Sequence, residues 1–257
     1  MIEPQNPMRA AQANMRPAPV RRFYRTVSLS ETEGGWALSL DGRAARTPGR
    51  NRLAAASRPL MLRVAEEWRR QGETLDPADM PITRLLNAAI DGVARAMEET
   101  RAEILRYAGS DLVCYRALEP ETLAERQRQA FDQVLDWAAE ALGARFALAG
   151  GVMPVPQSPE TLAAVRAALD RVEDPAALAA LSAVTTLTGS ATLALATAAG
   201  FLSAAEAWRA AHVDEDFQSE TWGVDAEAAA RRAARWREME GAAAALAALR
   251  DGSSRKE

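Results

Sequence analysis

Two hydrophobic periodicities divide the chain. Between residues 22 and 56 apolar and polar side chains alternate, which is typical of half-buried strands. From residue 57 onwards apolar side chains recur at intervals of three and four, which is typical of helices packed on one face. The pattern predicts an α+β protein, with a small N-terminal antiparallel β-sheet domain followed by a larger all-helical domain. We expect a disordered tail at 1–20, a β-rich domain at 21–75, a helical domain at 76–250 and a polar tail at 251–257.

Turn residues separate the predicted strands. The alternating runs are Phe23–Leu29, Trp36–Leu40 and Arg43–Thr47. An Asp-Gly pair at 41–42 stands between the second and the third run, and such a pair favours a two-residue hairpin turn. The sheet is therefore expected to be antiparallel.

Capping residues and prolines mark the helix starts. Ser57, Ser158 and Asp174 each precede a helical pattern as N-cap residues, with a proline within the next two positions. Ser203 with Glu206 forms a capping box. The expected helices cover about 57–72, 81–93, 98–107, 120–142, 158–172, 203–222 and 225–250.

The segment from Pro175 to Ala205 contains no charged residue. Its length would allow a membrane span, which takes about 20 apolar residues. However, Ala, Thr, Ser and Gly dominate the segment, and a Thr-Gly-Ser sequence at 188–190 interrupts it. We therefore expect two short buried helices that meet at Gly189, and no stable membrane insertion.

Composition excludes several functional classes. The chain has 257 residues, with His212 and Cys114 as its single histidine and single cysteine, which excludes an internal disulfide and a structural zinc site. Lys256 is the one lysine, so the chain has no Gly-Lys-Ser/Thr phosphate loop and no core lysine for a Schiff base. The net charge of −4 gives no electrostatic reason to expect nucleic acid as a partner. We expect no metal and no cofactor.

The segment 213–227 carries six acidic residues, and no basic residue occurs between Arg209 and Arg231. Most of these acids would lie in the last turns of a helix 203–222, where the helix dipole disfavours negative charge. Residues that go against such local structural preferences are enriched at functional sites. The candidate partner-binding residues are Asp214, Glu215, Asp216, Gln218, Glu220, Trp222, Asp225 and Glu227.

Two other interpretations of this segment remain open. If the last two helices fold back at Gly223, Glu215 would face Arg231 and Asp214 would face Arg232, and an ion-pair ladder would explain much of the charge. Alternatively, two of the carboxylates could serve as acid and base of a hydrolase.

Two further polar features have simpler interpretations. Arg84, Asn87 and Asp91 share one face of the predicted helix that starts at Pro81, either as a helix pair or as a network joining the two domains. Cys114 lies in an apolar context and is expected to be a core residue.

Six short motifs together resemble a known family. Taken in order, the motifs lie at 22–24, 40–43 with 46–48, 80–85, 107–112, 188–190 and 214–218 with 222–223. They resemble the assembly chaperones that bind the alpha subunit of the catalytic sector of F-type ATP synthase (mitochondrial F1 assembly factor 2-like proteins). The resemblance spans about residues 22–245 and is to the alphaproteobacterial branch of the family.

The resemblance implies a non-enzymatic chaperone that binds the unassembled ATP synthase alpha subunit and prevents its aggregation without using ATP. The acidic segment would form part of the client contact. On this basis we expect a cytoplasmic and monomeric protein. A carboxylate-based hydrolase is the alternative, and a peripheral membrane adaptor is a third possibility.

Overall fold

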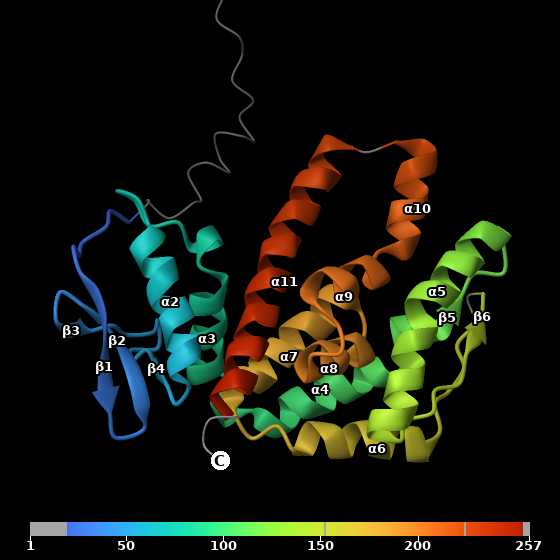
Figure 1. The fold of residues 1–257 in the computed structure, drawn as a ribbon, viewed down its shortest axis with the longest axis horizontal. Coiled ribbons are helices and arrows are strands. Elements are labelled where there is room, and N and C mark those ends of the chain that lie inside the picture. Colours follow the sequence, from blue (N-terminus) through green and yellow to red (C-terminus); the bar gives the residue numbers. More distant parts are fainter. Residues whose placement is uncertain (1–19, 152, 224, 254–257) are drawn as a thin grey trace, which may run out of the picture.

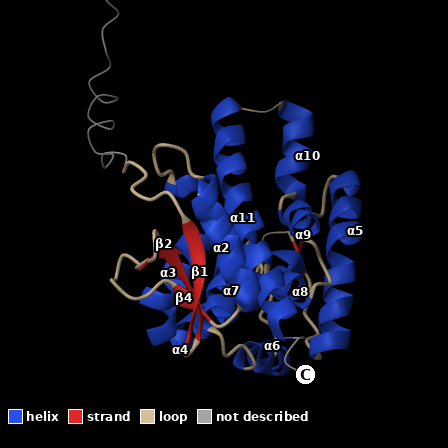
Figure 2. Cartoon of the chain, turned by 60° about the vertical axis from the view of Figure 1, so that its left-hand side comes forward, coloured by secondary structure: helices blue, strands red, loops and turns tan. Residues whose placement is uncertain are grey.

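A computed structural model describes residues 20–151, 153–223 and 225–253. A small antiparallel sheet, with helix α2 (Arg58–Arg70) against it, lies at one end of the molecule, and a larger helical part makes up the rest (Figures 1 and 2). The predicted α+β fold class is therefore confirmed. The tail expected at 1–20 lies outside the described residues except for Val20, and so do the last four residues of the polar tail.

Strand β2 is at the centre of the N-terminal sheet. It pairs antiparallel with β1, β3 and β4. The strands are β1 (Val27–Thr32), β2 (Gly35–Leu40), β3 (Arg43–Ala44) and β4 (Ala54–Ala55). The hairpin turn at 41–42 is confirmed, since Asp41 and Gly42 both have positive φ angles, 48° and 77°, as a primed turn requires.

The predicted start of the first strand at Phe23 is wrong by four residues. The segment before Val27 is held by helix α2 (Arg58–Arg70) and the chain that follows it. Tyr24 is buried and its hydroxyl donates to the carbonyl oxygen of Trp68 at 2.6 Å, while the Arg22 amide donates to the carbonyl of Glu73 at 2.8 Å. These contacts direct the chain away from the sheet until Val27.

The helical part contains nine longer helices among the described residues, joined by short helical turns and by one two-stranded parallel sheet. The helices are α3 (Pro81–Asp91), α4 (Met97–Gly109), α5 (Glu121–Trp137), α6 (Pro159–Asp170), α7 (Pro175–Thr188), α8 (Ala191–Ala199), α9 (Ala204–Ala211), α10 (Val213–Trp222) and α11 (Ala226–Ser253). The turns are Pro77–Asp79, Val93–Arg95, Leu112–Cys114 and Ala138–Leu142, and the small sheet pairs β5 (Tyr115–Arg116) with β6 (Ala149–Gly150).

Helices α7 and α8 confirm the expected buried pair. They meet at Gly189, whose φ of 70° favours glycine, and most of their side chains are buried. Helix α7 packs against α3, α4, α8 and α11, which places it at the centre of the helical part (Figure 1). Small side chains allow these helices to approach closely. Among the described residues, no helix combines the length and the apolar content needed to cross a bilayer.

Asp111 joins the turn after α4 to the start of α8. Its side chain is fully buried, and its Oδ2 accepts hydrogen bonds from the amide and the hydroxyl of Thr192 at 2.9 and 2.8 Å. Its Oδ1 accepts a bond from the amide of Val113 at 3.2 Å. The amide of the neighbouring Leu112 donates to the carbonyl of Gly189 at 3.2 Å. Two of the motifs, 107–112 and 188–190, therefore meet here and have a structural role.

Helix α3 is held at both ends by carboxylates that connect it to the N-terminal part. At its start, Glu67 of α2 accepts bonds from the amides of Ile82 and Thr83, both at 2.7 Å. At its end, Asp91 accepts a bond from the hydroxyl of Thr47 at 2.6 Å. The boundary expected at residue 75 remains a prediction, but these contacts indicate that the sheet and α3 are firmly joined.

The polar face of α3 is a set of connections to other elements. Arg84 forms an ion pair with Glu238 of α11 and also donates to the carbonyl of Pro77 at 2.7 Å. Asp91 binds the loop before β4, so these residues are not paired along the helix. The contacts of Asp91 join the helix to the N-terminal part, as expected for a network between the two domains. The partners of Arg84 lie within the helical part, and the side-chain oxygen of Asn87 has no hydrogen-bond partner among the described residues, so the expected network is confirmed for Asp91 alone. Cys114 is a core residue as expected, and burial raises the pKa of its thiol to about 12.

Candidate functional site

Helix α10 and the N-terminal part of α11 form an antiparallel hairpin that projects from the body of the molecule, while the C-terminal part of α11 packs within that body (Figure 1). The predicted single helix from Ser203 to Trp222 is wrong, because the chain bends at His212 between α9 and α10. The imidazole is 3% exposed, and its ring lies against that of Trp208 with 3.8 Å between the centroids. Its Nδ1–H donates to the carbonyl of Trp208 at 2.8 Å. This buried contact fixes the bend.

The bend changes the electrostatic interpretation of the acidic segment. Asp214, Glu215 and Asp216 lie in the first turn of α10, where the helix dipole favours negative charge. The expectation that they lie unfavourably at the end of a helix is therefore wrong. Glu220 does lie in the last turn of α10.

The predicted ion-pair ladder is wrong in register. Arg232 pairs with Asp216 at 2.5 Å, not with Asp214, and Arg231 pairs with Glu227 of its own helix at 2.5 Å. Helix α10 ends at Trp222 and α11 begins at Ala226, so the fold-back is not centred on Gly223, and Arg232 faces Asp216, two residues later than expected. Among the described residues, one ion pair between the two helices therefore replaces the predicted two.

Helix α5 provides further partners for the acidic segment. Arg126 forms an ion pair with Glu220 at 2.8 Å and lies 5.3 Å from the ring centre of Phe217. The side-chain amide of Gln127 donates to Oδ1 of Asp214 at 2.7 Å. These contacts attach α10 to the body of the protein, so part of the acidic charge has a structural function.

The remaining candidates face solvent. Glu215 is 59% exposed, and its carboxylate lies 3.8 Å from Nε2 of His212. Gln218 is exposed, and Trp222 is 86% exposed at the tip of the hairpin. Asp225 caps α11 by accepting a bond from the amide of Ala228 at 2.9 Å, as expected for an acid before a helix. The outer face of α10 thus combines negative charge with the solvent-exposed ring of Trp222.

A hollow of about 590 Å³ opens beside this face. Asp214 and Glu215 line it together with Leu118, Tyr115 and Phe131, which provide apolar surface. Leu118 is 71% exposed and contacts the backbone around Gly150. No sequence pattern indicates this hollow, because its walls come from segments distant in the chain. We call the hollow and the outer face of α10 together the hairpin surface.

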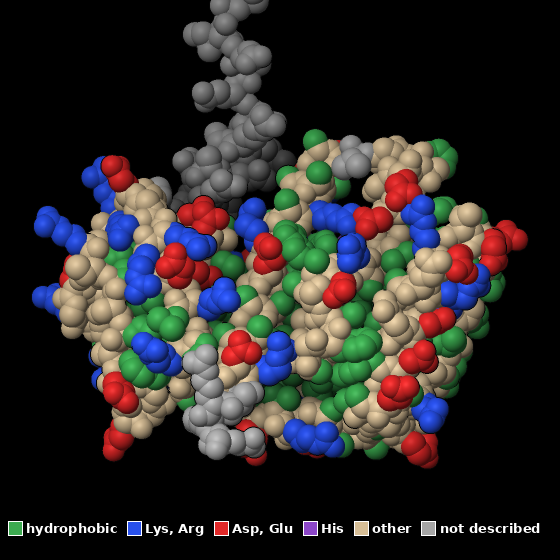
Figure 3. Space-filling view, in the orientation of Figure 1, with side chains coloured by type: hydrophobic (Ala, Val, Ile, Leu, Met, Phe, Trp, Pro, Cys, Tyr) green, Lys and Arg blue, Asp and Glu red, His purple; other side chains and the backbone are tan. Residues whose placement is uncertain are grey.

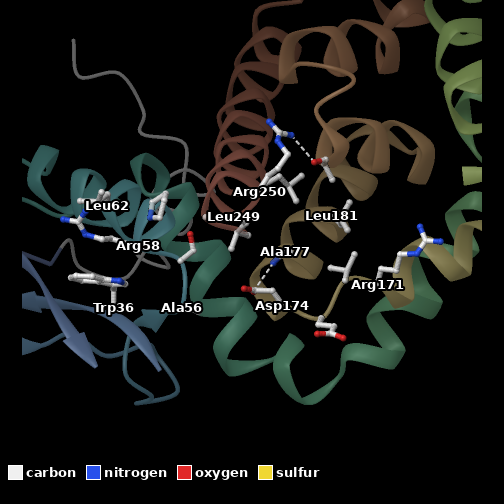
Figure 4. A pocket seen from close by; sticks show the side chains of 17 residues that line it. Trp36, Ala56, Arg58, Leu62, Arg171, Asp174, Ala177, Leu181, Leu249 and Arg250 are labelled. Atoms are coloured by element: carbon white, nitrogen blue, oxygen red, sulfur yellow. Dashed lines mark hydrogen bonds between the residues drawn. The ribbon is translucent and has the colours of Figure 1, made fainter. Parts of the chain in front are cut away.

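A second hollow, of about 710 Å³, lies between the N-terminal sheet and the helices α7 and α11 (Figure 4). Its polar groups serve the structure itself. Asp174 accepts bonds from the amides at the start of α7, Arg250 donates to the carbonyl of Ala198, and Arg58 stacks over Trp36 at 4.9 Å. Nothing in this arrangement indicates catalysis.

Burial of His212 has a consequence for pH dependence. Burial has the largest effect and lowers the pKa of the imidazole from its ordinary value of 6.5. The positive charges of Arg232 and Arg235 also lower this pKa, whereas the hydrogen bond to Trp208 and the negative charge of Glu215 raise it. Below about pH 6.5 the unfolded chain therefore takes up a proton that the folded chain does not. The free energy of unfolding falls as the pH decreases through this range.

Replacing His212 by glutamine is expected to reduce this acid sensitivity. A glutamine amide can donate to the carbonyl of Trp208 but does not titrate. Urea unfolding at pH 7.5 and 5.5 should give a smaller stability difference for His212→Gln than for the unmodified chain. An equal difference in both proteins would contradict the assignment.

Comparisons with known proteins identify the family. The model of the ATP12 chaperone protein family matches residues 21–139. Atp12 from Paracoccus denitrificans is 40% identical, with a TM-score of 0.83, and the match covers 89% of this chain and 98% of that one. The chain belongs to the ATP12 chaperone family. It is thus a chaperone of ATP synthase assembly, and family membership implies a non-enzymatic protein.

Two further solved structures support this assignment. A protein of Agrobacterium tumefaciens described as a candidate chaperone is 45% identical, with a TM-score of 0.87, over 96% of this chain and 92% of that one. An aspartate-to-lysine variant of the Paracoccus Atp12 protein matches with 40% identity and a TM-score of 0.83, over 89% of this chain and 97% of that one. The resemblance to the alphaproteobacterial branch of the ATP12 family is therefore confirmed.

Proposed function

We propose that this ATP12-family chaperone binds the unassembled alpha subunit of ATP synthase and that the hairpin surface forms part of the contact. The observation that carries the proposal is the exposed Trp222 at the tip of an acidic helix. Tryptophan is enriched among the residues that dominate binding energy at interfaces. Apolar surface beside Leu118 would receive client side chains that ATP synthase buries after assembly.

Several features support binding without catalysis. In the hydrolase alternative two carboxylates of the acidic segment would act as acid and base, but Asp216 and Glu220 form ion pairs with Arg232 and Arg126, and Asp214 accepts a hydrogen bond from Gln127. The neighbouring His212 is buried, and its Nδ1–H donates to the carbonyl of Trp208. Among residues 20–151, 153–223 and 225–253, no three His, Cys, Asp or Glu side chains are grouped to hold a metal ion. We propose that the protein acts in the cytoplasm as a monomer and needs no nucleotide.

Neutralising Asp214 and Glu215 tests the proposal. Asp214→Asn keeps an oxygen that can accept from Gln127, and Glu215 forms no close ion pair, so the double variant Asp214→Asn/Glu215→Gln is expected to fold normally. Its affinity for the purified alpha subunit should fall about tenfold, and the dependence of binding on salt should weaken. Calorimetric titration and a melting curve on the same samples provide the measurement.

The matched control is Asp136→Asn/Glu140→Gln, which removes the same charge from exposed positions at the end of α5 and in the turn after it. It should bind the alpha subunit like the unmodified chain. Equal losses in both double variants would show that net charge, and not the hairpin surface, determines binding. Failure of the unmodified chain to bind the alpha subunit would refute the proposed client.

A further inference from the structure

Charge is distributed unevenly along the chain. Residues 21–75 contain eleven arginines and six acids, whereas residues 76–250 contain sixteen arginines and 26 acids. Basic side chains project from the left-hand edge of the molecule in Figure 3, on the side where Figure 1 places β3. The N-terminal part is thus basic, and the part that carries the acidic hairpin is acidic.

A tight loop after β3 places two of these arginines directly opposite each other. Arg46 and Arg52 form an isolated antiparallel bridge. The flanking hydrogen bonds run from the amide of Thr47 to Asn51 at 2.9 Å and from the amide of Leu53 to Ala45 at 3.0 Å. This makes Arg46 and Arg52 a non-hydrogen-bonded pair, the type in which facing side chains are closest. Both side chains are exposed.

The loop itself is rigidly supported. Arg50 at its tip has a φ of 65°, a conformation that non-glycine residues rarely adopt, and its carbonyl accepts a bond from Nη1 of Arg46 at 2.8 Å. Asp91 accepts bonds from the hydroxyl of Thr47, the amide of Gly49 at 2.7 Å and the side chain of Asn51 at 2.8 Å. The three arginines are thereby held on one short segment.

Their charge is not compensated within the described part of the chain. No carboxylate there lies within 4.0 Å of the guanidinium groups of Arg46, Arg50 or Arg52. The hydrogen bonds that Asp91 accepts all come from other groups of the loop. Like charges placed directly opposite on two strands are destabilising. The loop therefore holds a cluster of positive charge that no carboxylate of the described residues neutralises.

We propose that Arg46, Arg50 and Arg52 bind an acidic segment of the client protein. The proposal rests on the proposed function, since it adds a second contact, at the opposite end of the molecule, to the one made by the hairpin surface. Guanidinium groups pair with carboxylates through two parallel hydrogen bonds, which suits a short acidic stretch. A long polyanion fits less well, because the acidic remainder of the chain repels it.

The test uses Arg46→Gln/Arg52→Gln, with Arg25→Gln/Arg63→Gln as matched control. Both control arginines are exposed on the same N-terminal part, and neither belongs to an ion pair within the described residues. Removing the facing charges is expected to weaken alpha-subunit binding roughly three- to tenfold at low salt and to flatten its salt dependence. The melting temperature should stay the same or rise, because the repulsion between the two side chains is lost. The control should leave binding unchanged.

A second probe separates this proposal from the proposed function. A fluorescently labelled peptide of ten glutamates should bind the unmodified chain and the control but bind the loop variant at least threefold more weakly. If the alpha subunit fails to bind the unmodified chain while the peptide result holds, the client assignment fails and the acidic-segment site stands. Equal peptide binding by all three proteins would overturn the site. So would binding of phosphatidylglycerol vesicles through these arginines without peptide binding.

Discussion

Replacing Trp222 by alanine is expected to weaken binding of the alpha subunit by about ten- to a hundredfold. The side chain is 86% exposed at the tip of the hairpin and packs against little of its own protein. Its removal should therefore shift the melting temperature by no more than about 2 °C, since exposed substitutions are usually nearly neutral for stability. A fluorescence or calorimetric titration with purified alpha subunit measures the loss.

Trp208→Phe is a useful comparison for this variant. Trp208 is buried against His212 and Trp236, so its replacement should lower stability and affect binding only through folding. The two variants thus distinguish a loss of direct contact with the client from a loss of binding that follows from lower stability. Unchanged affinity of Trp222→Ala would show that the exposed ring has no part in client recognition.

The largest expected effect on stability follows replacement of Asp111 by alanine. The change removes the acceptor of three hydrogen bonds, two from Thr192 at the start of α8 and one from Val113, and leaves a cavity in a fully buried position. Unsatisfied buried donors cost about 1–3 kcal/mol each, so we expect a loss of at least about 3 kcal/mol. For a chain of this size the melting temperature should fall by roughly 5–15 °C.

Chemical denaturation of Asp111→Ala and of Asp132→Ala provides the comparison. Asp132 is also an acid with a hydrogen-bonded partner, Arg116, but it is half exposed, so its removal should cost about 1 kcal/mol or less. Burial raises the pKa of Asp111, while bonds from Ser190, Thr192 and Val113 oppose this shift. Similar losses in the two variants would contradict the central role given to Asp111.

Local chemistry predicted much of the fold. Ser57, Asp174, Ser203 and Asp225 cap helices as expected, because a side-chain oxygen needs only a neighbouring amide two or three residues away. The turn at Asp41 and the meeting of two helices at Gly189 were likewise predictable from residues that tolerate positive φ.

The candidate site was predicted less well, because its geometry depends on tertiary contacts. No glycine or proline marks the bend at His212; it is held by the buried contact of His212 with Trp208, whose rings lie at an angle of 34° to each other. The partner of each acid depends on the register of the hairpin and on α5, which the sequence pattern does not specify. The four arginines between positions 43 and 52, with no acid among them, were a signal that could have indicated the basic loop.

Site-specific photo-crosslinking tests most directly whether the hairpin surface contacts the client. A photoreactive amino acid is introduced at Glu215 or Trp222, and at Ala163, an exposed position of α6. Figure 1 places helix α6 on the side of the helical part opposite to the hairpin tip. On irradiation with purified alpha subunit, we expect a covalent adduct from positions 215 and 222 and none from position 163. Adduct formation from position 163 with none from either hairpin position would contradict this expectation.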